Sequence, residues 1–393
     1  MKCKITHKPI KPFMSFGKMP IANGFLEKQD FSKEYFYNME VGFSEDLSLL
    51  QLNDHPKPEV MFNKNYPFFT SSSKHMIEHF KNYANFVRKY LNTNSKLIEI
   101  GSNDGTFLKN FSNNSNNIVG FEPSKNVAEL AQKNKVPTIN SFFNKKTIAN
   151  INEYLGNTDL ICASNVICHI PDLNDLIKSV DMLLSLDGTF VFEEPYLGSM
   201  FDQVSYDQIY DEHIYVFSVS SVSKIFERFN LYLVDAIPQK THGGSMRYVV
   251  KRKNDKSSQI KKIIEEEKIK KLDQIESCLM FKNNCEISKK RIVDKINILK
   301  NQGKSICGYA ATSKSTTILN YCQIGCDQID YICDTTSEKI GKFSPGMHIP
   351  IKDMDYFRKN QTDCIYLFAW NHKLEIMNKE KNFKGHWFSH VDL

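Results

Sequence analysis

The sequence lacks long hydrophobic runs. None of its apolar stretches reaches the roughly 18 residues that a membrane-spanning helix needs, and the polar start from Met1 to His7 lacks the apolar core of a secretory signal peptide. Charge of one sign is also scarce, because the formal net charge is only +6 and lysines are interleaved with Glu, Asp and Asn. We therefore expect a cytoplasmic protein with no membrane insertion and no nucleic-acid partner.

Paired cysteines are scarce as well. The ten cysteines are scattered, mostly within apolar runs such as residues 160–163, which is typical of reduced, buried thiols and excludes a disulfide framework. An apolar fraction of 41%, with 28 Phe and 17 Tyr, excludes a disordered chain. At 393 residues the chain is longer than a single hydrophobic core usually supports, so two or three domains are expected.

The order of apolar patterns predicts an α/β fold in four regions. Residues 1–75 are irregular and rich in Pro, Phe and Asn, whereas residues 76–256 alternate strand-like runs with helical periodicity, as βαβ domains do. Residues 257–302 carry apolar side chains at helical spacing, which predicts one long helix or a helical hairpin. Residues 303–393 resume the α/β alternation. Strands are expected at 97–100, 118–121, 160–163 and 189–193, at a hairpin of 231–238 and 245–251, and at 305–309, 329–333 and 364–369.

A loop bracketed by Gly101 and Gly105 follows the first strand of the central region. Glycines there allow tight turns and a close approach by a ligand. The loop lacks the full G-x-G-x-x-G spacing, and Asp104 stands where the pyrophosphate of a dinucleotide would lie. An acid in this place favours a ligand with a cationic ammonium group, which S-adenosylmethionine (SAM) carries.

Two further polar residues end strands near this loop. Glu122 ends the second strand and can accept both hydroxyls of a ribose, although NAD-binding domains place an acid there too. Asn165 ends the next strand. Taken singly, Gly101 could be an ordinary turn glycine, Glu122 a solvated acid and Asn165 a helix-capping residue. In this order and spacing, the three residues predict a SAM site. The cofactor residues that we predict are Glu99, Gly101, Ser102, Asn103, Asp104, Gly105, Glu122, Pro123, Asn165 and Val166.

Ionisable groups gather among aromatics at residues 206–215. His213 offers an imidazole that can act as a general base near neutral pH, with Glu212 or Tyr210 to orient it or to hold a substrate oxygen. The alternative is a helix with a core histidine. The segment 241–247 is a glycine turn before a strand, which could line the same cleft or form a plain hairpin turn.

The run from Leu97 to Arg247 closely resembles the sugar C-methyltransferases that act on dTDP-linked keto-deoxysugars in antibiotic biosynthesis. The matching motifs are those at 99–105, 120–124, 164–169 with 171–174, 210–213 and 241–245. The resemblance extends to nearly the whole chain through further motifs at 20–25, 66–71, 308–315, 319–321, 345–350 and 369–371.

This resemblance implies a Rossmann-like class I methyltransferase domain between a small N-terminal module and a C-terminal Rossmann-like α/β domain that helps hold a nucleotide-linked sugar. It makes His213 the base that removes the proton next to a ketone, with Tyr210 and Glu212 beside it. The strand–loop–helix turn at 308–315 could hold a pyrophosphate or be purely structural. The substrate residues implied are Tyr66, Glu194, Tyr196, His242, Gly243, Ser313, Lys314 and Asn371.

One departure from the family concerns zinc, which its N-terminal module typically holds with two C-x-x-C pairs. Here the first pair keeps only Cys3, with Thr6 in the second place, and the second pair is replaced by Ser44 and Leu47. A closed zinc site needs four N or S ligands, and Cys3 with His7 cannot supply them. We therefore predict no zinc and no other metal.

Three alternatives to C-methylation stay open at this point. The same fold could methylate a hydroxyl of a nucleotide-linked sugar or of a surface-polysaccharide precursor, with His213 deprotonating an alcohol. The Gly101 loop could serve a nicotinamide-dependent oxidoreductase or epimerase, against which Asp104 and the missing third glycine count. A non-catalytic sugar-nucleotide binder is the third. The sequence specifies no oligomeric state, and a monomer is the default expectation.

Overall fold

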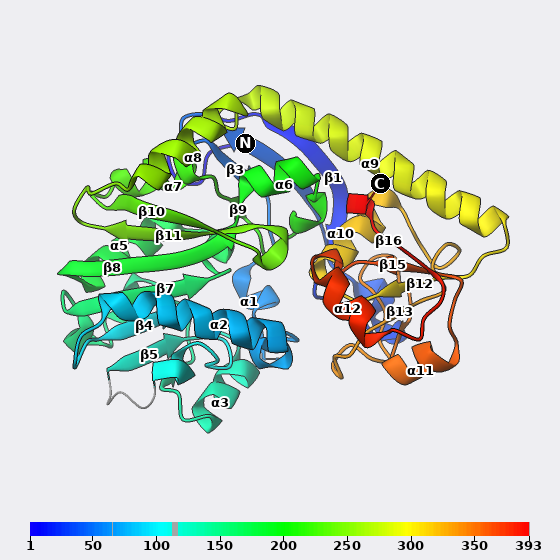
Figure 1. The fold of residues 1–393 in the computed structure, drawn as a ribbon, viewed down its shortest axis with the longest axis horizontal. Helices are drawn as coiled ribbons and strands as arrows, with labels where there is room; N and C mark the ends of the chain where they lie inside the picture. Colours follow the sequence, from blue (N-terminus) through cyan, green and yellow to red (C-terminus); the bar gives the residue numbers. More distant parts are fainter. Residues whose placement is uncertain (65, 112–116, 393) are drawn as a thin grey trace.

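The computed structural model describes residues 1–64, 66–111 and 117–392 and contains three β-sheets with helices around them (Figure 1). This confirms the predicted α/β fold. Helix α9 runs along one side of the molecule from the central sheet to the C-terminal one, and β1 passes between these two sheets (Figure 1). The N- and C-terminal thirds therefore both reach the region where the two larger sheets face each other.

Residues 1–75, which we expected to be irregular, form most of a four-stranded sheet. Its order is β1-β2-β3-β9, and β1 and β2 are antiparallel with two register shifts, between Pro12 and Met14 and between Ser15 and Gly17. Such bulges interrupt the alternation of polar and apolar residues that would reveal a strand in the sequence. The strands are β1 (Pro12–Pro20), β2 (Phe36–Ser44), β3 (Leu49–Leu52) and β9 (Tyr215–Val216), and the short helix α1 (Pro58–Met61) follows β3.

The central sheet has seven strands in the order β10-β11-β8-β7-β4-β5-β6. Strands β8 to β6 in that order are parallel, whereas β11 and β10 close the sheet as an antiparallel hairpin, as predicted. The strands are β4 (Leu97–Ile100), β5 (Ile118–Phe121), β6 (Thr138–Ile139), β7 (Thr158–Ser164), β8 (Leu184–Pro195), β10 (Tyr232–Gln239) and β11 (Ser245–Lys251). The helices are α2 (Lys74–Val87), α3 (Lys125–Lys133), α4 (Lys145–Ile148), α5 (Leu173–Leu183), α6 (Leu197–Gln203) and α7 (Val219–Glu227).

Alternate residues of the central strands enter different cores. Ile98 and Ile161 pack in one apolar cluster, whereas their neighbours Leu97 and Leu160 pack in another on the opposite side of the sheet. A sheet buried on both faces requires the continuous apolar runs that made these strands visible in the sequence. Because the carboxyl ends of parallel strands meet at one edge, the loops after β4, β5 and β7 gather there.

The connector and the C-terminal region complete the fold. The predicted single helix or hairpin at 257–302 is two helices, α8 (Ser258–Ile269) and α9 (Ile275–Asn301). A five-stranded parallel sheet follows, in the order β14-β13-β12-β15-β16. Its strands are β12 (Ile306–Tyr309), β13 (Tyr331–Cys333), β14 (Ile351–Lys352), β15 (Cys364–Leu367) and β16 (His386–Phe388), with helices α10 (Ser313–Cys322), α11 (Met354–Lys359) and α12 (Lys373–Lys379).

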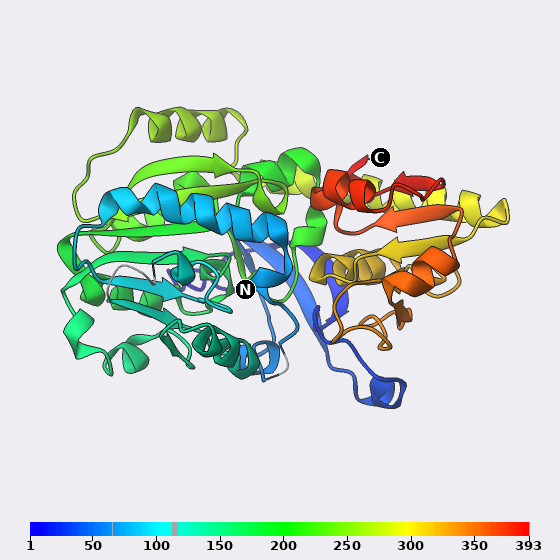
Figure 2. The same cartoon turned by 60° about the horizontal axis from the view of Figure 1, so that its bottom comes forward.

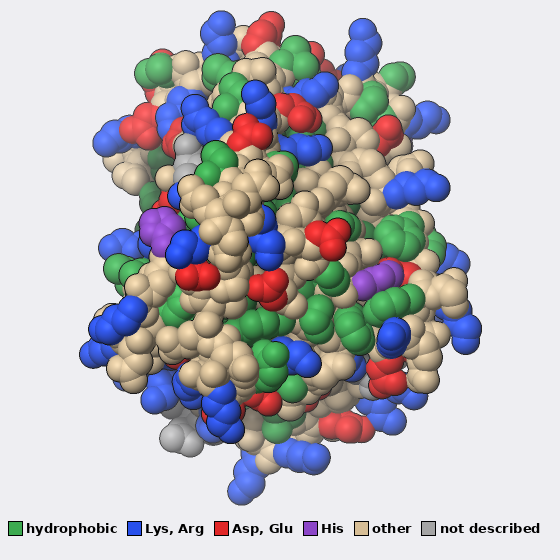
Figure 3. Space-filling model, turned by 90° about the vertical axis from the view of Figure 1, so that its right-hand side faces the viewer, with side chains coloured by type: hydrophobic (Ala, Val, Ile, Leu, Met, Phe, Trp, Pro, Cys, Tyr) green, Lys and Arg blue, Asp and Glu red, His purple; other side chains and the backbone are tan. Residues whose placement is uncertain are grey.

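Two expectations from the sequence, no membrane insertion and no nucleic-acid partner, can be compared with the helices and with one face of the surface. In the part of the chain that the structure describes, no helix combines the length and the apolar character needed to cross a bilayer. On the end of the molecule formed by the C-terminal sheet, basic side chains are interspersed with acidic and apolar ones (Figure 3). This is the mixed surface that the interleaved charges of the sequence indicated.

Candidate active site

A cleft of about 550 Å³ opens where the three sheets approach one another. The central region lines it with the loops after β4, β5 and β7, the N-terminal region with Asn23, Phe62 and Tyr66, and the C-terminal region with Lys314 and Asn371. The β1 segment lies in blue between the two larger sheets (Figure 2). Asn23, three residues after β1, reaches Glu212 of the catalytic segment, residues 206–215, through a hydrogen bond of 2.7 Å. The cleft is therefore shared by all three parts of the chain.

The loop after β4 has the backbone that its glycines predicted. Gly101 and Gly105 adopt φ angles of 66° and 80°, and Asn103 between them has φ 48°. The carboxylate of Glu122 accepts the Asn103 N–H at 3.1 Å and the Ser124 N–H at 2.7 Å. Glu122 thus ties the first loop to the second, and it also lines the cleft, where its predicted role toward a ribose stays a prediction.

Asp104 does not face the cleft, which corrects the role we predicted for it. Its carboxylate accepts the Ser71 N–H at 2.8 Å and the Thr106 hydroxyl at 2.6 Å, so it fastens the loop to the segment before α2. Gly105 is likewise absent from the cleft lining. The acid that lines the cleft beside Gly101 is Glu99.

Three buried acceptors around this loop fit the donors of SAM. Glu99 Oε2, Ser102 Oγ and Asn165 Oδ1 are buried and have no hydrogen-bond partner. Burial, with Asp104 and Glu122 nearby, raises the pKa of Glu99 well above its usual range. Since buried polar atoms are rarely left unpaired, these atoms indicate a ligand that carries donors, such as an ammonium group. Eight of the ten predicted cofactor residues line this cleft, and the two that do not are Asp104 and Gly105.

The hydrogen bonds of His213 fix which of its nitrogens is basic. His213 Nδ1 lies 2.7 Å from the Gln208 carbonyl oxygen, which can only accept, so Nδ1 carries the proton. His213 Nε2 then accepts from the Tyr210 hydroxyl at 2.7 Å. Burial, with His169 nearby, holds the pKa of His213 well below its usual range. The imidazole is therefore neutral at pH 7, with its lone pair directed at Tyr210 in the cleft.

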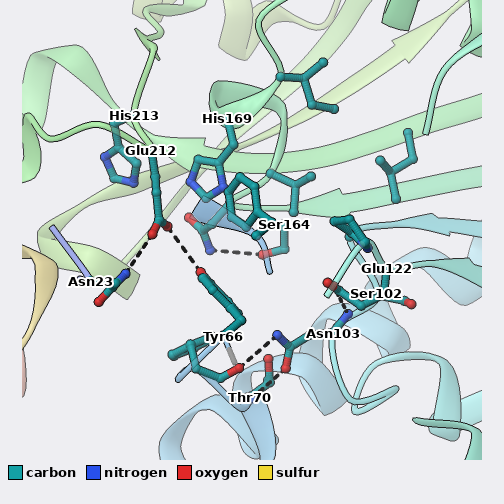
Figure 4. A pocket seen from close by; sticks show the side chains of 18 of the residues that line it. Asn23, Tyr66, Thr70, Ser102, Asn103, Glu122, Ser164, His169, Glu212 and His213 are labelled. Carbon is teal, nitrogen blue, oxygen red and sulfur yellow. Dashed lines mark hydrogen bonds between the residues drawn. The ribbon is translucent and has the colours of Figure 1, made fainter. Parts of the chain in front are cut away.

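Glu212 is held between two side chains from the N-terminal region (Figure 4). Its carboxylate accepts from Asn23 Nδ2 at 2.7 Å and from the Tyr66 hydroxyl at 3.2 Å. Asp211 accepts the Ala22 N–H at 3.1 Å, and its other oxygen has no partner. Burial, with Glu212 nearby, raises the pKa of Asp211 to about 8. Because Glu212 accepts at both oxygens, we assign the negative charge to Glu212 and a proton to Asp211 at pH 7.

His169 is a cleft residue that our site prediction missed. Its ring lies 5.4 Å from that of His213 and 5.6 Å from that of Phe62, and its Nε2 is buried without a partner. Burial lowers the pKa of His169 to about 3, so it is neutral. His169 belongs to the matching motif at 164–169, but no feature of the neighbouring sequence distinguished it from a histidine of the core. Lys339 and Asn23 also line the cleft and were also missed.

The structure brings five of the eight predicted substrate residues to the cleft: Tyr66, His242, Ser313, Lys314 and Asn371. The other three do not line it. Glu194 accepts the N–H groups of Val166 at 3.0 Å and Ile167 at 2.6 Å, beneath the loop after β7. The Tyr196 hydroxyl donates to Glu267 of α8 at 2.9 Å. Gly243 packs against Trp370, where an added Cβ would lie 2.2 Å from the ring.

The buried Glu194 makes stability depend on pH. Burial raises its pKa to about 7 from the ordinary 4.5, so its contribution to stability is complete below about pH 4.5 and is lost as the pH rises through 7, by about 3 kcal/mol. Glu194→Gln keeps an acceptor for both N–H groups without this titration. We expect the melting temperature of the wild type to fall by several degrees more than that of the variant between pH 5 and 8.

Calorimetric melting at both pH values measures this difference. The exposed Glu265 on α8 supplies a control variant, Glu265→Gln, which should follow the wild type. Equal slopes for wild type and Glu194→Gln would show that Glu194 does not change its protonation between these pH values.

Comparison with known proteins agrees with this geometry. A family model described as a methyltransferase domain matches residues 73–236, and one described as a C-methyltransferase C-terminal domain matches residues 240–390. The chain is also 28% identical over 389 residues to the C-methyltransferase NovU of Streptomyces niveus, covering 97% of this chain and 92% of the relative. The chain is a SAM-dependent methyltransferase that is similar to a C-methyltransferase over nearly its whole length. A third model, described as a putative zinc binding domain, matches residues 3–62 of this methyltransferase.

Solved structures resemble the methyltransferase over less than half of its length. A SAM-dependent methyltransferase from Thermotoga maritima has a TM-score of 0.36 at 16% identity and covers 45% of this chain and 92% of its own. A SAM-dependent methyltransferase from Anabaena variabilis has a TM-score of 0.36 at 17% identity and covers 44% of this chain and 83% of its own.

Proposed function

We propose that this methyltransferase transfers the methyl group of SAM to a carbon next to the ketone of a nucleotide-linked keto-deoxysugar, with His213 as the general base. The observation that carries the proposal is the neutral His213 imidazole, whose Nε2 is directed at the Tyr210 hydroxyl within the cleft that also contains the Gly101 loop. When bound, SAM supplies a methyl group on a positively charged sulfur. The protein must then make a carbon nucleophilic.

Removing a proton next to a ketone requires a base and a stabilised oxygen. His213 Nε2 takes up the proton, either directly after Tyr210 turns aside or through the Tyr210 hydroxyl, which would pass its own proton to Nε2 while accepting the one from carbon. The Nδ1–H bond to Gln208 holds the imidazole in the required tautomer. The ionised Glu212 lies close enough to Tyr66 to orient its hydroxyl.

The developing negative charge on the ketone oxygen needs a hydrogen-bond donor in the cleft. His169 supplies the best candidate, because its neutral ring carries one N–H and its Nε2 is buried and unpartnered. A neutral donor held in place by the surrounding protein costs little reorganisation when charge appears. The His169 and His213 rings lie 5.4 Å apart, which supports a donor that acts close to the base.

Two lysines of the cleft, the buried Lys314 and the half-buried Lys339, support a substrate with anionic groups. Lys314 Nζ lies 3.4 Å from Asn371 Oδ1, and Lys339 Nζ donates to the Ala311 carbonyl oxygen at 2.8 Å, so their hydrogen-bond partners are neutral. Carboxylates lie farther away, that of Asp207 near Lys314 and those of Asp334 and Glu212 near Lys339. Burial lowers the pKa of each lysine. An anion in the cleft would offset the cost of burying two ammonium groups, and a diphosphate at the start of α10 fits the pyrophosphate role expected for the 308–315 turn.

Hydrogen–deuterium exchange without SAM tests the proposal. We would incubate the enzyme with dTDP- and GDP-linked 4-keto-6-deoxysugars in D₂O and follow deuterium at the carbons next to the ketone by NMR and mass spectrometry. A C-methylating base should catalyse exchange at one carbon, and adding SAM should place the methyl group on that carbon.

His213→Asn should abolish the exchange, whereas the matched control His386→Asn, on the surface, should retain it. Methylation of a sugar oxygen with no exchange would overturn the carbon assignment in favour of an O-methyltransferase. Binding of these sugars with neither exchange nor methylation would favour a binding protein.

A further inference from the structure

The N-terminal module, residues 1–75, matches a family model described as zinc binding but does not contain the residues for a zinc site. A closed zinc site takes four Cys or His ligands. Within the matched residues 3–62 the sequence has one cysteine, Cys3, and two histidines, His7 and His55. Even if all three side chains bound the same zinc ion, one of the four ligands would be missing.

These three residues do not meet. Cys3 is fully buried, His7 is exposed, and His55 Nδ1 bonds the neighbouring Pro56 carbonyl oxygen at 2.9 Å. Across the described residues, the one group of three ligand-type side chains close enough to share a metal is Cys168, His169 and His213, in the catalytic cleft. The module therefore needs another structural centre.

Two turns face each other where the two ligand pairs would stand. In the first, the Cys3 N–H donates to the Lys8 carbonyl oxygen at 2.9 Å and the Thr6 N–H donates to Cys3 Sγ at 3.4 Å. In the second, the Leu47 N–H donates to the Ser44 carbonyl oxygen at 3.2 Å.

Ionic and polar contacts fasten the two turns. An ion pair of 2.6 Å joins Lys8 to Asp46. The buried Gln51 side chain accepts the Lys4 N–H at 3.0 Å and donates to the Lys2 carbonyl oxygen at 3.0 Å. Neighbouring backbone groups are thus satisfied without a metal-bound ligand.

Apolar side chains fill the space between the turns. Cys3, Ile5, Leu47 and Leu49 are each 3% exposed or less, and they belong to the same apolar cluster as Tyr215. We infer that this cluster replaces zinc as the structural centre of the module, so that the methyltransferase folds and works without a metal there. Cys3 then acts as a small apolar residue rather than as a thiolate ligand.

The apolar cluster that replaces zinc is connected to the active site by strand β9. This strand begins two residues after His213 and is the fourth strand of the N-terminal sheet. The Leu52 N–H donates to the Ile214 carbonyl oxygen at 2.8 Å, directly beside the base. Packing around Cys3 and Leu47 therefore supports the catalytic segment. The inference does not depend on which substrate is methylated.

Metal analysis and chelation of the full-length protein test the inference. Protein from zinc-supplemented culture should contain no stoichiometric zinc by inductively coupled plasma mass spectrometry, and the chelator TPEN should leave its melting temperature within about a degree of the untreated value. Stoichiometric zinc, or a fall of several degrees with TPEN, would overturn it.

Paired variants test the apolar role itself. Cys3→Val and Leu47→Met keep an apolar side chain, whereas Cys3→Ser and Leu47→Asn bury a polar one. We expect the polar member of each pair to melt several degrees below the apolar member. If Cys3→Ser were as stable as Cys3→Val and Leu47→Asn as stable as Leu47→Met, the cluster would not be the structural centre and the inference would fail.

Discussion

Replacing His213 with Asn is expected to lower kcat by about 10²–10⁴-fold, the contribution of a positioned general base, while SAM binding stays unchanged. Asn retains an N–H that can reach the Gln208 carbonyl, but it has no nitrogen lone pair to accept the proton from carbon. The expected effect is large because His213 Nε2 is the one nitrogen in this catalytic segment whose hydrogen bonding leaves it basic and neutral.

Steady-state kinetics with the best substrate of the sugar panel measure this loss, and calorimetric titration with S-adenosylhomocysteine checks cofactor binding. His386→Asn on the exposed end of β16 is the matched control and should keep wild-type kcat. A His213→Asn enzyme with undiminished kcat would remove His213 from the chemistry and shift the search for the base to His169.

Replacing Glu122 with Gln is expected to weaken binding of S-adenosylhomocysteine by about 30–100-fold. The carboxylate already accepts two backbone N–H groups and has lone pairs left for ribose hydroxyls. An amide can accept at only one of its two ends, so hydrogen bonds to a charged group worth about 2–3 kcal/mol are lost. The dissociation constant from calorimetry gives the result.

Glu129→Gln, at an exposed position of α3, the helix that follows the same strand, should bind as the wild type does. Because Glu122 also ties two loops together, the melting temperature of Glu122→Gln must be recorded beside its affinity. Unchanged affinity in a folded variant would place the ribose elsewhere in the cleft.

Local sequence was sufficient where a residue's role depends on its immediate neighbours. The strands of the central sheet were visible because both faces are buried, and Gly101 and Glu122 were visible because they follow such strands directly. The segment 210–213 is equally local, since His213 bonds Tyr210 three positions away and Gln208 five positions away. Roles for these residues could therefore be proposed before any tertiary contact was known.

Other assignments failed because the deciding partner lies far along the chain. Asp104 was expected to face the cofactor, but it bonds Ser71, 33 positions earlier, and Tyr196 was expected to face the substrate, but it bonds Glu267, 71 positions later. The N-terminal sheet was missed because bulges break its pattern and because its last strand, β9, follows β3 by more than 160 residues.

The amino-acid sequence by itself determined that this is an α/β protein and led to the proposals of a SAM loop at Gly101 and a base at His213, because short-range periodicity, glycine turns and contiguous motifs encode these features. The tertiary structure alone decided which acid faces the cleft, that His169, Asn23 and Lys339 join it, and that apolar side chains surround Cys3. Side-chain direction and burial arise from contacts between distant segments, which no local pattern records.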